Sequence, residues 1–183
     1  GYLAINGAVK KQKYTYFLYE SNDGSTKESP AYCVNPNQYG VPQTVGPGES
    51  IKYLANEKAS DPKVVGIISN GYPHRSLGEL GLENKYQAFY ATKMALWSYL
   101  ISDWDINKLT VNPNLSGDEA ERAKKILAAA GILVLAGAAA TAFYIWKKNK
   151  TQVATSVSII GGADGPTSIF LAGKLDNSAD EGT

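Results

Sequence analysis

Two side chains of this sequence carry nucleophilic atoms in settings that could support chemistry: the thiol of Cys33 and the amine of Lys93. Cys33 is the only cysteine among the 183 residues, which excludes an internal disulfide and a cysteine-rich metal site. It lies in AYCV (31–34), a short predicted strand that precedes a loop rich in proline and glycine at 35–50. A lone cysteine is often an inert, buried side chain, and this interpretation stays open.

Lys93 lies in the middle of an apolar stripe. Segment 86–101 has helical periodicity, and one broad face collects its large apolar residues, namely Tyr86, Phe89, Tyr90, Met94, Leu96, Trp97, Leu100 and Ile101. An ammonium there is costly unless it reaches water or finds a partner. Either the side chain extends along the apolar surface to solvent, or this helix position belongs to a site. If Lys93 faces Cys33, the ammonium favours the thiolate, and burial favours the neutral amine.

Other function classes receive less support from the residues. The single histidine, His74, argues against a zinc enzyme. A cysteine hydrolase that uses Cys33 and His74 ranks last, because GYPHRS (71–76) is typical of an exposed turn and no third orienting group is evident. The net charge of +1 implies no broad attraction to nucleic acid. We expect no cofactor, no metal and no enzymatic activity.

The elements that must position these residues indicate an α+β fold. Strands are predicted within 2–20, at 31–34 and at 51–55, with a loop at 21–30. Helices are predicted from Pro62 to an Asn-Gly turn, over 86–101, and from Ser116, which is spaced as a capping box with Glu119. We therefore expect a β-sheet or barrel-like domain with a small helical subdomain at 1–127, an apolar helix at 128–150 and a short tail at 151–183.

The segment from 126 to 146 holds no charge over about 20 residues, which is the length that spans a bilayer. Lysines flank it on both sides, and its end is aromatic, as at a membrane interface. It is predicted to span a membrane, and a buried helix rich in alanine and glycine, or a pair of strands, is the alternative. The tail at 155–174 is predicted to form a hairpin around GGADGP.

Four segments together resemble a known family. AYCVNPNQYGVP, VVGIISNGYP, ATKMALW and AERAKKIL are similar, in order and spacing, to the thioester domains of Gram-positive surface adhesins, over about 1–127. In that family a cysteine joins the glutamine of a helical Thr-Gln-x-Ala-x-Trp motif in an internal thioester. The resemblance implies a domain at the tip of a surface adhesin or pilus. It also implies a host-cell or extracellular-matrix protein as partner, whose amine attacks the thioester.

The resemblance assigns Cys33 to the family's cysteine and Lys93 to the position of its glutamine. A lysine has no carbonyl carbon, so Lys93 is expected to alter or abolish the bond. We expect Tyr32, Tyr72 and Trp97 to line the pocket. Two glutamines are weaker candidates for the bond. Gln87 lies on the same helix about 120° away, and Gln152 lies in TQVA (151–154), a chance match after the apolar segment.

A second resemblance concerns the tail. SIIGGADGPTSIF looks like a motif in the β subunit of sodium-pumping decarboxylases, where an aspartate at the position of Asp164 is implicated in moving sodium. The alternative function is therefore a membrane accessory protein related to these pumps. A glycine-proline turn with a solvated aspartate is the simpler interpretation of the same residues.

Overall fold

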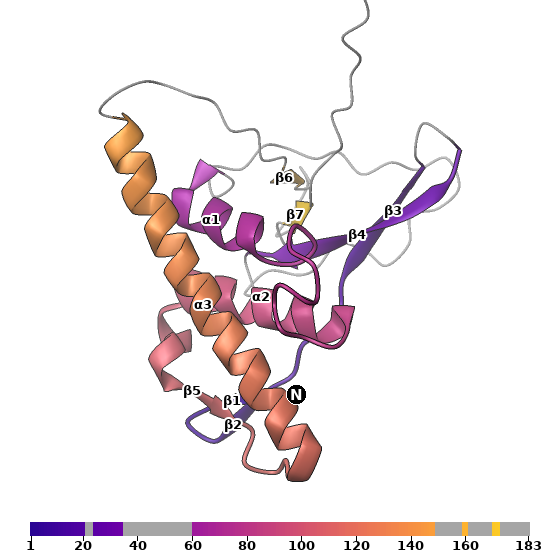
Figure 1. The fold of residues 1–183 in the computed structure, drawn as a ribbon, viewed down its shortest axis with the longest axis vertical. Coiled ribbons are helices and arrows are strands. Elements are labelled where there is room, and N and C mark those ends of the chain that lie inside the picture. Colours follow the sequence, from indigo (N-terminus) through magenta and orange to yellow (C-terminus); the bar gives the residue numbers. More distant parts are fainter. Residues whose placement is uncertain (21–23, 35–59, 149–158, 161–169, 173–183) are drawn as a thin grey trace, which may run out of the picture.

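The computed structural model describes residues 1–20, 24–34, 60–148, 159–160 and 170–172 (Figure 1). Its strands are β1 (Leu3–Ile5), β2 (Ala8–Lys10), β3 (Tyr16–Glu20), β4 (Thr26–Cys33), β5 (Leu109–Val111), β6 (Ile159–Ile160) and β7 (Phe170–Ala172). Its helices are α1 (Pro62–Asn70), α2 (Lys85–Leu100) and α3 (Gly117–Lys148), with 3₁₀ turns at Ser102–Trp104 and Ile106–Lys108. The predicted α+β class is confirmed, while the predicted strand at 51–55 lies outside the described residues.

The described strands form two open antiparallel sheets rather than a barrel. One sheet has the order β2–β1–β5 and the other β3–β4–β7–β6. The strand predicted in KYTYFLYE (13–20) is confirmed as β3, and the earlier part of 2–20 holds a further hairpin, β1–β2. Its turn is at Asn6 and Gly7, which have positive φ values of 49° and 76°. An Asn-Gly pair favours such a two-residue turn, because its backbone twist matches that of the flanking strands.

Strand β4 carries the cysteine and is longer than predicted. It begins at Thr26, inside the stretch predicted as a loop, because the register with β3 extends from Tyr16 opposite Pro30 to Glu20 opposite Thr26. Backbone pairing across this ribbon outweighs the weak strand preference of its polar residues. At the other end of β4, Cys33 lies opposite Phe170 of β7, which in turn pairs with β6. The strand pairing predicted for the tail is thus present, although its turn lies outside the described residues.

Helix α1 begins and ends where the sequence predicts. Asp61 caps it, because its carboxylate accepts hydrogen bonds from the backbone N–H groups of Lys63 (2.8 Å) and Val64 (3.4 Å), and Pro62 occupies the first turn. Gly71 follows the helix, and a Cβ there would lie 2.5 Å from Cγ2 of Thr92 in α2. Only glycine therefore allows the chain to pass this close to α2.

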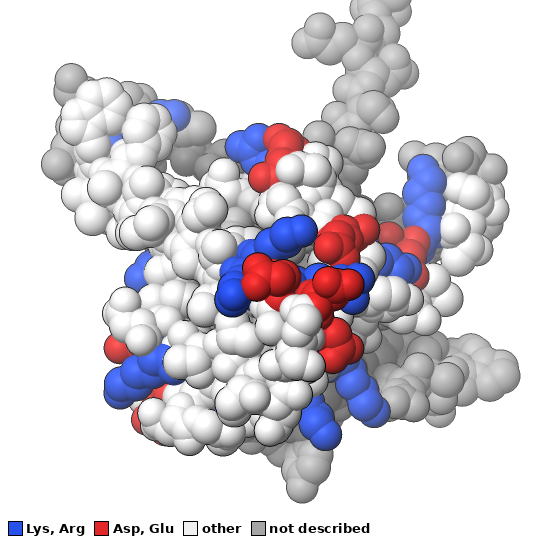
Figure 2. All heavy atoms as spheres, turned by 60° about the horizontal axis from the view of Figure 1, so that its bottom comes forward, with Lys and Arg blue, Asp and Glu red and all other residues white. Residues whose placement is uncertain are grey.

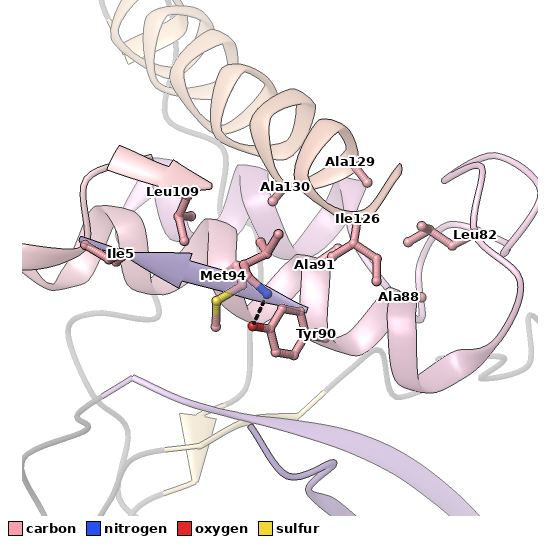
Figure 3. Packing of buried hydrophobic residues seen from close by; sticks show 11 residues of the cluster. Ile5, Leu82, Ala88, Tyr90, Ala91, Met94, Leu109, Ile126, Ala129 and Ala130 are labelled. Atoms are coloured by element: carbon pink, nitrogen blue, oxygen red, sulfur yellow. Dashed lines mark hydrogen bonds between the residues drawn. The ribbon is translucent and has the colours of Figure 1, made fainter. Parts of the chain in front are cut away.

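Helix α2 is buried on every side between residues 87 and 97, so the prediction of a single apolar face is wrong. Two clusters of buried side chains lie on its two sides. The first cluster joins α2 to β4, α1 and α3 and contains Tyr32, Val34, Val64, Ile67, Ile68, Phe89, Ala95, Leu96, Trp97 and Leu133. The second joins α2 to β1, β5 and α3 and contains Leu3, Ile5, Leu82, Ala88, Tyr90, Ala91, Met94, Leu109, Ile126, Ala129 and Ala130 (Figure 3).

Helix α3 crosses both other helices and runs without interruption through the predicted boundary at 127–128 (Figure 1). The segment 126–146 is therefore helical, and the alternative of a strand pair is wrong. Its first half packs on α2 through Ile126 and Ala130, and its middle packs on α1, where a Cβ on Gly66 would lie 2.5 Å from that of Ala140. Small residues at this crossing let the two backbones approach closely.

The last turns of α3 extend beyond this packing. The exposed large apolar side chains there are Phe143, Tyr144, Ile145 and Trp146. By length and composition, 117–147 is apolar enough to cross a membrane, a property that core helices share. However, α3 stays packed on α1 as far as Ala140, so only the residues after Ala140 extend beyond the fold. The helix residues from 141 to 148 span roughly 12 Å, less than half of a bilayer's hydrocarbon core. The membrane span predicted for 126–146 stays a prediction.

Ion pairs fasten the start of α3 to the chain before α2. Glu83 lies 3.0 Å from Nε of Arg122 and 3.6 Å from Nζ of Lys125. Figure 2 shows that acidic and basic side chains interleave at the centre of one face of the molecule rather than separating into patches of one sign. These exposed pairs orient α3 and contribute little to stability.

Candidate functional site: an amine beside a thiol

Lys93 lies inside the fold, with 6% of its surface exposed. Its Nζ lies 4.9 Å from the ring centroid of Trp97 and 5.5 Å from that of Phe89. These residues are four positions after and four positions before it, so each ring lies one helical turn away on the same side of α2. The lysine therefore does not extend across the surface to water, and its amine rests between two aromatic rings, which attract a cation.

The Cys33 thiol lies next to this amine. Trp97 connects the two elements, because its Nε1 donates a 2.6 Å hydrogen bond to the backbone carbonyl of Cys33 at the end of β4. The thiol interacts electrostatically with the Lys93 amine, and the cysteine itself is half-buried. The structure thus brings together two residues that are 60 positions apart in the sequence.

Burial lowers the pKa of Lys93 to about 8, and the neighbouring Cys33 thiol opposes this shift. The cause is the loss of water around the ammonium, which disfavours its charged form. Within the described part of the chain, no carboxylate forms an ion pair with Nζ and no oxygen accepts a hydrogen bond from it. With this pKa, about a tenth of the amines are neutral at pH 7 and can act as nucleophiles.

Aromatic side chains form one wall of the site. Tyr32 is 1% exposed and stacks on Phe89, with ring centroids 4.6 Å apart. Its hydroxyl donates a 2.6 Å hydrogen bond to the carbonyl of Tyr72, whose N–H donates to Oγ1 of Thr92 at 3.0 Å. Burial raises the pKa of Tyr32, so its phenol stays protonated and keeps this bond. Of the predicted lining residues, Trp97 touches the amine, Tyr32 supports Phe89, and Tyr72 is attached through its backbone.

Phe89 is a site residue that was not predicted from the sequence. A signal for it was present, because Phe89 and Trp97 flank Lys93 at the spacing of one helical turn in each direction. Aromatic residues at both of these positions lie one turn before and one turn after the lysine on the same side of the helix, so they contact its side chain regardless of which side faces the core.

The weaker candidates lie elsewhere. Gln87 is buried, and its side chain bonds to Glu83: its Oε1 accepts from the backbone N–H at 3.1 Å and its Nε2 donates to Oε2 at 3.3 Å. The structure therefore does not bring Gln87 to the thiol. His74 is exposed in the turn after α1. Gln152 and Asp164 lie outside the described residues.

This arrangement contains two nucleophiles and no electrophile. A thioester between positions 33 and 93 requires an acyl carbon on one side, and neither a thiol nor an amine provides one. Nor does any group of three histidine, cysteine, aspartate or glutamate side chains within the described ranges form a metal site. The chemistry available to the pair is the transfer or capture of an electrophilic group.

Comparison with known proteins identifies the family. A family model described as thioester domain matches residues 30–139, which is more than half of the chain and includes both Cys33 and Lys93. The chain belongs to the thioester domain family. A comparison with curated protein sequences finds no match.

Several solved structures of thioester-domain proteins are similar to the chain. The Bacillus anthracis TIE protein is 19% identical, with a TM-score of 0.46 over 86% of this chain and 23% of its own, so this chain spans about a quarter of that protein. The N-terminal domain of the Streptococcus pyogenes pilus tip adhesin Cpa is 17% identical, with a TM-score of 0.46 over 93% of this chain and 91% of its own. The N-terminal thioester domain of the S. pyogenes fibronectin-binding protein SfbI is 14% identical, with a TM-score of 0.49 and the same coverage.

Within the thioester domain family, this chain has a lysine, whose side chain has no carbonyl carbon, at the position that the resemblance assigns to the glutamine. The resemblance of the sequence implies a bond between the residues at positions 33 and 93, and the structure places their side chains together. Nothing in the described residues or in these comparisons supports the alternative of a decarboxylase accessory protein.

Proposed function

We propose that this chain is a ligand-binding domain of a bacterial surface adhesin in which Lys93 prevents the internal thioester. The observation that carries the proposal is that Lys93 lies within electrostatic reach of Cys33, with Trp97 touching both residues, inside the matched family segment. Because the glutamine carbonyl is replaced by an amine, this domain binds its ligand without the acyl transfer that the resemblance implies for its relatives. Its role is adhesion rather than enzymatic turnover.

The proposed partner is a protein on a host cell or in the extracellular matrix, and the proposed location is the cell surface. Family membership and the resemblance of the sequence to adhesin domains support both. The exposed apolar end of α3, with Phe143, Tyr144 and Trp146, supports an additional contact with the membrane surface.

The experiment that tests the proposal restores the missing carbonyl. In a Lys93→Gln variant we expect a spontaneous bond to Cys33 with loss of one ammonia, visible as a lower intact mass. Methylamine should open this bond and add its own mass, because it attacks an activated acyl group. The unsubstituted chain should show neither change.

Two control variants give the test its specificity. Lys85→Gln adds a glutamine at an exposed position of the same helix and should remain unreactive. Lys93→Gln combined with Cys33→Ala should lose all methylamine sensitivity. A folded Lys93→Gln chain without a methylamine adduct, or an unsubstituted chain that gains one, would contradict the proposal.

A further inference from the structure

We propose that Cys33 and Lys93 form an acyl-accepting pair, in which Cys33 takes an acyl group from an activated ester or thioester and passes it to Lys93. The inference rests on the proposed function, because it assigns a ligand class to the same site. It reverses the polarity that the resemblance implies for the family: there the protein carries the acyl group and the ligand the amine, whereas here the protein carries the amine.

Two independent features of the site support this assignment. Cys33 is half-buried at the end of β4, so this residue is more accessible to a reagent than the lysine. The amine is more than nine-tenths buried, and its Nζ lies against the Trp97 and Phe89 rings and interacts with the thiol. Within the described ranges, no hydrogen-bond acceptor or carboxylate holds this amine. Thus a reagent from outside meets the cysteine first, and the lysine is the next nucleophile.

The reaction balances without an oxidant or cofactor. In the first step the Cys33 thiolate attacks the carbonyl of the donor thioester, a new carbon–sulfur bond forms, and the donor's thiolate leaves. In the second step the neutral Lys93 amine attacks the carbonyl now held by Cys33. The carbon–nitrogen bond forms, the carbon–sulfur bond breaks, and the proton lost by nitrogen returns the cysteine to a thiol. The products are an amide on Lys93 and the free thiol of the donor.

The environment favours the second step for two reasons. Burial lowers the pKa of Lys93 to about 8, so a neutral amine is available near neutral pH. Before the reaction the interior holds a poorly hydrated ammonium, which is costly. Formation of the amide removes this charge. The rings of Phe89 and Trp97 make the surroundings of the amine apolar. These walls suit an acyl group that is itself apolar.

The test uses the full chain and the acetyl thioester of N-acetylcysteamine at pH 7.5. Intact mass should show the gain of one acetyl group, which peptide mapping should locate on Lys93. Neutral hydroxylamine cleaves thioesters but not amides, so the adduct of the unsubstituted chain should resist it. In a Lys93→Met variant the acetyl group should stay on Cys33, and hydroxylamine should remove it.

Two further measurements test the order of the steps. Cys33→Ser should slow acetylation of Lys93 by about tenfold or more, because an alcohol is a weaker nucleophile than a thiol. Blocking the thiol of the unsubstituted chain with methyl methanethiosulfonate should have the same effect without any change of sequence. The matched control is Lys85→Met, which should leave the reaction unchanged.

Acetylation of Lys93 at an equal rate in the thiol-blocked chain would overturn the inference, as would an adduct of the unsubstituted chain that hydroxylamine removes completely. Absence of any adduct would also overturn it. The proposed function fails separately, because it depends on the methylamine reaction of Lys93→Gln. A Lys93→Gln chain that forms a thioester, together with an unsubstituted chain that accepts no acetyl group, would retain the function and reject the acyl transfer.

Discussion

Helix α2 holds two lysines over aromatic rings, Lys85 at its first position and Lys93 in its middle, and the two differ in how strongly they hold their proton. Nζ of Lys85 lies 5.1 Å from the ring of Tyr14 and 5.5 Å from that of Tyr86, much as Lys93 lies over its own two rings. However, Lys85 is 37% exposed and lies 2.9 Å from Oε1 of Glu28. The hydrogen bond to this carboxylate raises the pKa of Lys85, whereas burial lowers that of Lys93.

The comparison shows that aromatic rings alone do not determine the protonation state of a lysine. Both amines have similar ring contacts, so the difference comes from their other surroundings. Lys85 is exposed to solvent and pairs with a carboxylate, whereas Lys93 is buried and has no carboxylate partner among the described residues. A ring offers a weak attraction for a cation, and this does not replace lost hydration. Lys85 is thus a permanent surface cation, and Lys93 is an amine that can lose its proton near neutral pH.

The largest expected effect comes from Lys93→Met. In the unsubstituted chain the pKa of the Lys93 amine is about 8, below the ordinary value of 10.5. The folded state therefore binds this proton more weakly than the unfolded state does. The ammonium therefore reduces stability below pH 8, and this penalty disappears as the pH rises from 8 to 10.5. We expect the variant to gain about 3 kcal/mol in free energy of unfolding at pH 6. Urea unfolding at pH 6, 7, 8 and 9 should show the gain decreasing above pH 8.

The matched change on the same helix is Lys85→Met. It removes an exposed ion pair, so we expect only a small loss of stability, with no change between pH 6 and pH 8. A stabilising effect of Lys85→Met, or a destabilising effect of Lys93→Met at pH 6, would break the comparison.

The next effect in size is expected from Trp97→Phe. This change removes the 2.6 Å hydrogen bond to the Cys33 carbonyl and reduces contact with Trp104, whose ring centroid lies 4.8 Å away. We expect a loss of about 2 kcal/mol, because a buried carbonyl is left without its donor. Tyr86→Phe is the control at the other end, since Tyr86 is 57% exposed and its change should have almost no effect. Urea unfolding of both variants at pH 7 measures the difference, and equal losses would contradict it.

The sequence predicts the elements near the site better than their packing. Local signals place α1, because Asp61 and Pro62 mark its start, and the periodicity of 86–101 places α2. The burial of α2 on all sides could not be derived from the same periodicity, since a hydrophobic stripe records only the large residues. Small residues such as Ala91 and Thr92 are also buried, because α1 and α3 lie directly against them.

The contact between Cys33 and Lys93 was expected only from the family resemblance. A single sequence holds no information on which strand meets which helix across 60 residues, so composition and spacing could not supply it. The two alternatives for Lys93, a surface side chain or a member of a site, could be separated only when β4 was placed beside α2. The rings that surround the amine, by contrast, are encoded locally at positions 89 and 97.

The smallest expected effect comes from Glu28→Gln, which removes the feature that distinguishes Lys85 from Lys93. Glu28 accepts a 2.5 Å hydrogen bond from the Tyr14 hydroxyl and one from Lys85, and these lower its pKa. Its contribution is therefore present above the ordinary carboxyl value and is lost as the pH falls through the lowered one. Because both partners are about a third exposed, we expect a loss near 0.5 kcal/mol at pH 7 that about 1 M NaCl abolishes. Urea unfolding with and without salt checks this, and a loss that persists in salt would show that Glu28 acts through its bond to Tyr14 rather than through the charge of Lys85.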